Sequence, residues 1–128
     1  MHLELITLLV DDYDRAIRYF VDALGFELVE DLSATTSGGD AKRWVVVRPI
    51  GAVTGFLLAR ADGISQRERV GSQVGERVGF FLRVDDFDEA YARLAATGAE
   101  FLGEPRKEPY GTVVVFRDLY GNRWDLLG

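Results

Sequence analysis

Apolar and polar positions follow the same order twice along this chain. A strand-like apolar run, Leu5–Val10, ends in two aspartates, and a second run, Gly79–Val84, ends in the same way. After each aspartate pair, apolar residues recur every three to four positions, which is the spacing of an amphipathic helix. The junctions read VDDYDRA at residues 10–16 and VDDFDEA at residues 84–90. A repeat this close predicts a fold built in two halves.

Both predicted helices have sequence signals at their ends. Asp12 and Asp86 stand where a carboxylate accepts the free backbone N–H groups of a first helical turn, and Glu89 completes a capping-box pattern. Gly25 and Gly98 stand at the C-terminal ends, where a residue with positive φ is favoured. The expected packing faces are Tyr13, Ile17, Phe20 and Leu24 in the first helix and Phe87, Tyr91 and Leu94 in the second.

Three more strands are predicted after each helix. A short run follows each glycine, at residues 26–29 and 99–102, and the runs WVVVR and VVVFR come next. Each half closes on a last strand, GFLLA at residues 55–59 and WDLLG at residues 124–128. The order of strand, helix and three strands, written twice, predicts an α+β fold of two tandem βαβββ modules.

We expect one domain over residues 1–128. The first module is placed at about 1–62 and the second at about 76–128, because the segment between them, at about 63–75, is polar and glycine-containing and is typical of a linker. Residues 32–42 are rich in serine, threonine and glycine and are predicted to be a mobile loop able to cover a ligand site.

Composition narrows the function classes. Hydrophobic residues make up 48% of the chain and aromatic residues 12%, which predicts a packed core. Cysteine is absent, which excludes disulfides, thiolate metal sites and cysteine nucleophiles. The formal charge of −6 argues against a nucleic-acid binder. Because no apolar stretch approaches the roughly 20 residues that span a bilayer, we expect no membrane partner. The absence of cysteine and of a signal-peptide pattern favours a cytoplasmic location.

The βαβββ repeat, with V-D-D-x-D-x-A at the start of each helix, and the terminal segment RDLYGNRWDLL resemble the vicinal-oxygen-chelate superfamily. That superfamily includes glyoxalase I, extradiol dioxygenases, fosfomycin-resistance enzymes and bleomycin-binding resistance proteins. The terminal segment is close to the family pattern D-P-x-G-N-x-x-E-L, with Leu119 in place of the proline. The resemblance implies sheets that curl around a cavity and modules that pair across a homodimer.

The resemblance also implies four positions that hold a divalent cation in the metal enzymes of this superfamily. They fall on Leu5, Phe56, Gly79 and Asp125, and of these only Asp125 carries a ligand atom. A cation needs several converging nitrogen or oxygen donors. The single histidine, His2, lies an odd number of residues before Leu5, so its side chain is expected to turn away from the cavity. We therefore expect neither a metal nor another cofactor.

Residues on the same strand face as the four family positions, together with one tyrosine from a loop, are the candidate ligand-binding residues. They form a mainly apolar set with an aromatic pair and a few polar groups, as in small-molecule sites: Leu5, Thr7, Phe56, Phe81, Arg83, Tyr110, Arg123 and Asp125. The apolar members have a plainer explanation, that they fill the space a metal occupies elsewhere. Asp125 either pairs with Arg83 or Arg123, or meets a cationic or hydroxyl group of a ligand. Tyr110 either closes over the cavity or packs on the surface.

Three functions remain open at this point. The first is a metal-independent protein that binds and sequesters a small antibiotic-like or cationic aromatic molecule, as the resemblance to bleomycin-binding proteins implies. The second is a glyoxalase- or lyase-like enzyme that works without metal, with Asp125 as catalytic general base. The third is a divergent glyoxalase-like enzyme that takes metal through other residues. The composition of the expected cavity favours the first.

Overall fold

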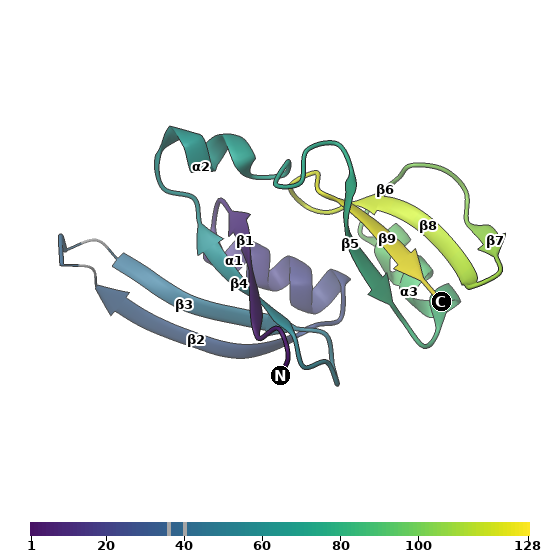
Figure 1. The fold of residues 1–128 in the computed structure, drawn as a ribbon, viewed down its shortest axis with the longest axis horizontal. Coiled ribbons are helices and arrows are strands. Elements are labelled where there is room, and N and C mark those ends of the chain that lie inside the picture. The colour runs from purple at the N-terminus through teal and green to yellow at the C-terminus, as the bar shows by residue number, and fades with distance from the viewer. Residues whose placement is uncertain (36, 40) are drawn as a thin grey trace. The chain divides into compact units, whose positions relative to one another are not determined.

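The computed structural model describes residues 1–35, 37–39 and 41–128 (Figure 1). The chain divides into two compact units, Met1–Val70 and Gly71–Gly128. Each unit has the order strand, helix and three strands, with one short extra strand in the second, so the predicted α+β fold of two βαβββ modules is confirmed. None of the helices in these ranges combines the length and the apolar character that a membrane crossing requires.

The first unit packs one helix against a four-stranded mixed sheet. The strands follow the spatial order β1-β4-β3-β2, with β1 and β4 parallel and the other pairs antiparallel. Its strands are β1 (Leu5–Val10), β2 (Glu27–Thr35), β3 (Ala41–Arg48) and β4 (Gly55–Arg60), and its helices are α1 (Tyr13–Arg18), the π-helical turn η1 (Tyr19–Ala23) and α2 (Gly63–Arg69).

The second unit repeats this plan around a core built on Trp124 and Phe116. Its strands follow the order β5-β9-β8-β6, and β7 pairs with the start of β8, on the edge opposite β9. The helix contributes Ala90 and Leu94 to the core and contacts β9. The elements are β5 (Val78–Arg83), α3 (Phe87–Ala96), β6 (Glu100–Phe101), β7 (Arg106–Glu108), β8 (Gly111–Arg117) and β9 (Arg123–Leu127).

The helix ends follow the sequence signals. The carboxylate of Asp12 accepts from the backbone N–H of Arg15 at 2.8 Å, and that of Asp86 accepts from the N–H of Glu89 at 3.1 Å. The glycines after the helices, Gly25 and Gly98, have φ of 73° and 79°. The predicted caps and stops are therefore confirmed, and they fix where each helix leaves its sheet.

Two segments differ from the predictions. Within the expected loop 32–42, β2 continues to Thr35 and β3 begins at Ala41, because the β2–β3 ladder runs from Glu27↔Arg48 out to Thr35↔Ala41; residues 36 and 40 lie outside the described residues. Part of the expected linker is the helix α2, whose first turn is closed by Gln66 Oε1 accepting from the backbone N–H of Asp62 at 2.9 Å. Local side-chain bonds thus impose order on polar segments.

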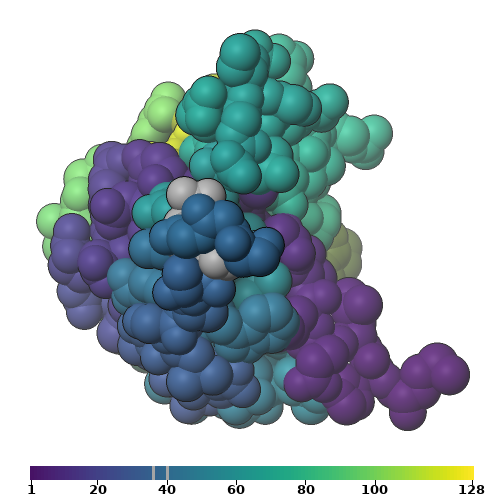
Figure 2. Space-filling model, turned by 90° about the vertical axis from the view of Figure 1, so that its left-hand side faces the viewer, coloured from purple at the N-terminus to yellow at the C-terminus, as the bar shows by residue number. Residues whose placement is uncertain are grey.

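Strands β3 and β4 separate toward one end of the first sheet. They pair at Val45↔Leu58, Val46↔Leu57 and Val47↔Phe56, whereas β3 stays paired with β2 along its whole length. The outer ends of β2 and β3 therefore extend past the end of β4 (Figure 1). In the space-filling view these outer ends, in blue, form the near face of the first unit (Figure 2). The opening between β3 and β4 forms the site described next.

Candidate functional site

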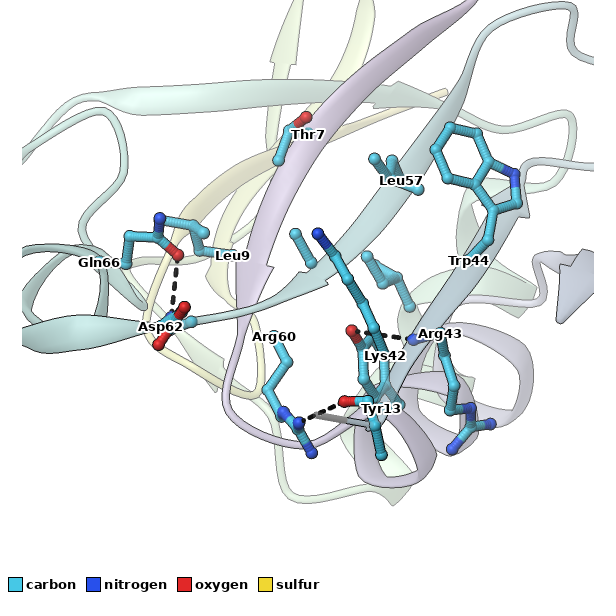
Figure 3. A pocket seen from close by; sticks show the side chains of 14 residues that line it. Thr7, Leu9, Tyr13, Lys42, Arg43, Trp44, Leu57, Arg60, Asp62 and Gln66 are labelled. Carbon is cyan, nitrogen blue, oxygen red and sulfur yellow. Dashed lines mark hydrogen bonds between the residues drawn. The ribbon is translucent and has the colours of Figure 1, made fainter. Parts of the chain in front are cut away.

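A pocket of about 640 Å³ lies on the first unit where β3 and β4 separate (Figure 3). Its floor is apolar, because the ladder pairs Thr7↔Leu57 and Leu9↔Ala59 place these side chains on one face of the sheet. Trp44 lies on the same face, since it is two residues from Val46, the ladder partner of Leu57. The indole is 44% exposed and forms a wall of the pocket.

Tyr13 and Arg60 fill the gap that the separating strands leave. Arg60 donates a hydrogen bond to the backbone carbonyl of Ala41 at 3.0 Å, and the backbone N–H of Arg43 donates to the Tyr13 hydroxyl at 3.5 Å. The guanidinium carbons of Arg60 and Arg43 lie 5.4 and 5.2 Å from the centre of the Tyr13 ring. Side chains thus satisfy backbone groups that would otherwise pair across β3 and β4.

The guanidinium of Arg43 is paired with two carboxylates of the first unit. Its guanidinium donates two hydrogen bonds to Asp31, at 3.1 and 2.7 Å, and one to Asp14, at 2.9 Å. The hydrogen bonds from Arg43 hold the pKa of Asp31 below its usual range, against the opposing effect of desolvation. The same bonds raise the pKa of Arg43 above its usual value. This cluster fixes the outer part of β3 against the start of α1.

The second unit presents a different polar group on the sheet face away from α3. Asp125 pairs with Phe81 on β5 and with Val115 on β8. Its Oδ1 is buried and has no hydrogen-bond partner among the described residues. Burial raises the pKa of Asp125, and the positive charge of Arg106 partly offsets that rise. Because Phe81 is 65% exposed, an open aromatic ring stands beside a poorly solvated carboxylate.

Neither arginine suggested as a partner for Asp125 takes that role in the described structure. Arg123 donates to the backbone carbonyl of Glu76, and Arg83 pairs along the sheet with Leu127. The cation that acts on Asp125 is Arg106, which sequence reasoning missed. Its strand, β7, is only three residues long and carries no hydrophobic alternation, so no pattern in the sequence indicates its position.

Tyr110 and Arg106 form a small surface cluster. Arg106 donates to the carboxylate of Glu108 at 3.0 Å, and this bond, together with the neighbouring Tyr110 hydroxyl, raises the pKa of Arg106 above its usual value. Tyr110 is 55% exposed. Both alternatives for this tyrosine, closing over a cavity and packing on the surface, remain open as predictions.

The predicted placement of Phe56 on the cavity face is wrong. Its ladder partner is Ile6, so its side chain points to the face opposite Leu5 and Thr7. The ring is 8% exposed and its centre lies 6.0 Å from that of Phe20 on the helix. Phe56 therefore belongs to the core of the first unit.

Leu57 is the residue that corresponds to Asp125. The junction repeat relates Thr7 to Phe81, and their ladder partners are Leu57 and Asp125, respectively. The error arose because Phe56, Leu57 and Leu58 are all apolar. Such a run shows no alternation from which the two faces can be told apart, and a slip of one residue exchanges them.

The family's cation positions do not fit a metal in this chain. Leu5, Leu57 and Gly79 offer no ligand atom, and within the described ranges no three His, Cys, Asp or Glu residues gather into a possible metal site. A side chain at Gly79 has no room, since a Cβ there would lie 2.7 Å from a methyl carbon of Val74. His2 is exposed and bonds Glu4 at 2.7 Å. One carboxylate, Asp125, does not hold a divalent cation.

Comparison with known proteins shows to which protein family the chain belongs. Residues 2–126 match the family described as the Glyoxalase/Bleomycin resistance protein/Dioxygenase superfamily. This chain belongs to that superfamily. An uncharacterised protein of Shewanella frigidimarina is 48% identical to it over 123 residues, which cover 95% of this chain and 89% of that protein.

Two solved structures show the same fold at about 30% identity or just below. UcmS2 is 30% identical with a TM-score of 0.78, and the match covers 99% of this chain and 97% of that one. TnmS3, an antibiotic binding protein from a Streptomyces species, is 29% identical with a TM-score of 0.73, covering 99% and 94%. The superfamily thus includes, among the structures similar to this chain, a protein that binds an antibiotic.

Proposed function

We propose that this chain binds and sequesters a small, planar, largely apolar molecule without a metal. The observation that carries the proposal is the open pocket of about 640 Å³ on the first unit, with Leu9 and Leu57 in its floor and Trp44 in its wall. Small-molecule sites have this size and this mixture of apolar surface with a few polar groups. The similarity to the antibiotic binding protein TnmS3 supports a natural-product ligand.

The donor positions support metal independence. Three of the four positions that would hold a cation carry leucine or glycine, as described above, and the fourth, Asp125, has Phe81 and Val115 as its ladder partners. The pocket on the first unit has Asp62 as its acidic lining residue and no histidine among its described residues. Ligand affinity is therefore expected to come from apolar contact and a few charges.

A thermal-shift screen tests this proposal. The protein, dialysed against EDTA, is heated with a panel of planar polycyclic antibiotics, and a bound ligand raises the melting temperature by mass action. We expect at least one saturable shift, reduced in Trp44→Ala and kept in Ile50→Ala, which removes an exposed side chain that is not part of the pocket. A panel without any shift, or shifts that appear only when a divalent metal is restored, contradicts the proposal.

A second function is favoured by Asp125. A carboxyl whose pKa is raised by burial is a better general base near neutral pH than a solvated one, and Phe81 beside it offers a surface for a substrate. On this alternative, Asp125→Asn abolishes turnover of a bound substrate and leaves its binding intact. If Asp125→Asn instead weakens binding and no turnover is found with wild type, the sequestering function stands.

We also propose that the chain forms a homodimer. Leu32 on β2 is 60% exposed, and Phe81 on the second sheet is 65% exposed. Apolar side chains of this size on sheet faces favour cover by a second copy. Light scattering at micromolar concentration is expected to give twice the chain mass of 14.3 kDa, and a single species at 14.3 kDa overturns the proposal.

A further inference from the structure

Three cationic side chains are found among the described residues that line the pocket of the first unit: Lys42, Arg43 and Arg60. This is unexpected in a chain with a formal charge of −6. Two of the three have partners within the unit, because Arg43 bonds Asp31 and Asp14 and Arg60 bonds the carbonyl of Ala41. Both arginines also lie against the Tyr13 ring. They are structural parts of the wall.

Lys42 differs from both arginines. It lies on the same face of β3 as Trp44, two residues away, and Figure 3 shows its ammonium directed into the pocket and away from Arg43. Among the residues that the structure describes, the ammonium has no ion-pair or hydrogen-bond partner. Asp62 stands on the other side of the pocket beside Gln66, as the same view shows.

The spacing of Lys42 and Trp44 defines a ligand shape. Side chains two residues apart on a strand stand about 6.5–7 Å from each other on one face. A planar ring system that lies on the apolar floor against Trp44 would therefore bring a substituent at its edge to the Lys42 ammonium. An anionic oxygen at that edge gains an ion pair with the ammonium, a neutral acceptor gains only a weaker hydrogen bond, and an edge without an acceptor gains nothing there.

We infer that Lys42 makes this pocket selective for planar aromatic molecules that carry an anionic group, such as a carboxylate, a sulfonate or an ionised phenol. The inference rests on the proposed function, because it assigns the ligand class of the same pocket. The ligand charge inferred from Lys42 is opposite to the one expected from Asp125, since a carboxylate would favour a cationic ligand. The pocket of the first unit and the Asp125 face of the second therefore make opposite predictions about ligand charge.

Two dyes that differ in one group test the inference. 8-Anilinonaphthalene-1-sulfonate and N-phenyl-1-naphthylamine share the same aromatic skeleton, and only the first carries a sulfonate. Each is titrated by fluorescence into wild type and into Lys42→Met, which keeps the length of the side chain and removes its charge. We expect Lys42→Met to weaken the sulfonate dye about five- to tenfold and to change the neutral dye less than about twofold.

Three controls separate charge from folding. Lys107→Met removes the only other lysine of the sequence and should leave both dyes unchanged, since Lys107 is not among the described residues that line this pocket. Lys42→Arg should restore most of the affinity for the sulfonate dye. Raising the salt concentration should reduce the preference of wild type for the sulfonate dye and leave that of Lys42→Met unaffected.

The two proposals fail in different ways. If neither dye binds wild type, the proposed function is contradicted together with the inference. If both dyes bind and Lys42→Met weakens them equally or not at all, the pocket binds planar molecules without charge selection, and only the inference is overturned.

Discussion

The indole Nε1 of Trp124 donates a 3.0 Å hydrogen bond to Oδ2 of Asp118, and both residues are buried. The same oxygen accepts from the side-chain amide of Asn122 at 3.0 Å. The other oxygen, Oδ1, accepts from the backbone N–H groups of residues 120–122 at 2.9 to 3.0 Å. One carboxylate thus organises the turn of the D-L-Y-G-N segment and positions β9, which carries Asp125. In this chain, the family motif therefore supplies the hydrogen bonds that hold this turn.

Removing this carboxylate should strongly destabilise the second unit. Asp118→Ala leaves buried N–H donors without an acceptor, so we expect the free energy of unfolding to fall by about 3 kcal/mol or more. Denaturant unfolding followed by fluorescence measures it in a Trp44→Phe background, where Trp124 is the remaining tryptophan. Asp88→Ala, on the exposed surface of α3, is the matched control and should cost less than about 1 kcal/mol. A loss below 1 kcal/mol in Asp118→Ala would show that the turn does not depend on the carboxylate.

The approach of Gly71 to the same turn gives a second prediction. A Cβ at Gly71 would lie 1.9 Å from the backbone oxygen of Tyr120, and its φ is +84°. Gly75 has a φ of +69° with no atom within 4 Å of its Cβ position. Gly75→Ala should therefore lower the free energy of unfolding by only about 1–2 kcal/mol, which is the cost of a side chain at positive φ. Gly71→Ala should cost roughly 2 kcal/mol more, because the backbone must move as well. Equal losses in thermal unfolding would contradict this contact.

Asp125 predicts an unusual dependence of stability on pH. Burial raises its pKa in the folded state above the ordinary value of 3.8, so the charged form is disfavoured in the folded protein at neutral pH. The resulting loss of folding stability disappears as the pH falls through the pKa of Asp125 in the folded state towards its pKa in the unfolded state. Asp125→Asn imitates the protonated carboxyl. It should therefore raise the melting temperature at pH 7, with a gain that shrinks steadily towards pH 4.

The opposite result has a clear meaning. If Asp125→Asn lowers the melting temperature across this pH range, the carboxylate holds a structural partner, as the sequence-based alternative with Arg83 or Arg123 supposed. Differential scanning fluorimetry of wild type and variant in matched buffers distinguishes the two outcomes.

Sequence reasoning succeeded where one local interaction decides the structure. Asp12 and Asp86 bond the first turns of their helices, and Gly25 and Gly98 take the positive φ that ends them. These signals involve residues three or four apart. The order of strand, helix and three strands in each module could therefore be read from the repeat, whereas α2 and β7 were not predicted.

The site was harder to predict because its geometry depends on partners far apart in the chain. No local pattern shows that residues 41–44 of β3 do not pair with β4. The pocket with Lys42 and Trp44 therefore could not be located from the sequence. The position of Phe56 failed for a related reason, since an all-apolar run does not reveal its register. Arg106 was missed because β7 is recognisable only by its pairing with β8.

The central claim is that the first unit binds a planar molecule without a metal, and calorimetric titration of N-phenyl-1-naphthylamine into EDTA-dialysed protein tests it most directly. We predict saturable binding with one site per chain, unchanged by added Mn²⁺ or Zn²⁺. Trp44→Ala should weaken it about tenfold, because the variant removes the aromatic wall of the pocket. No saturable heat, or binding that appears only after metal is added, would contradict the account.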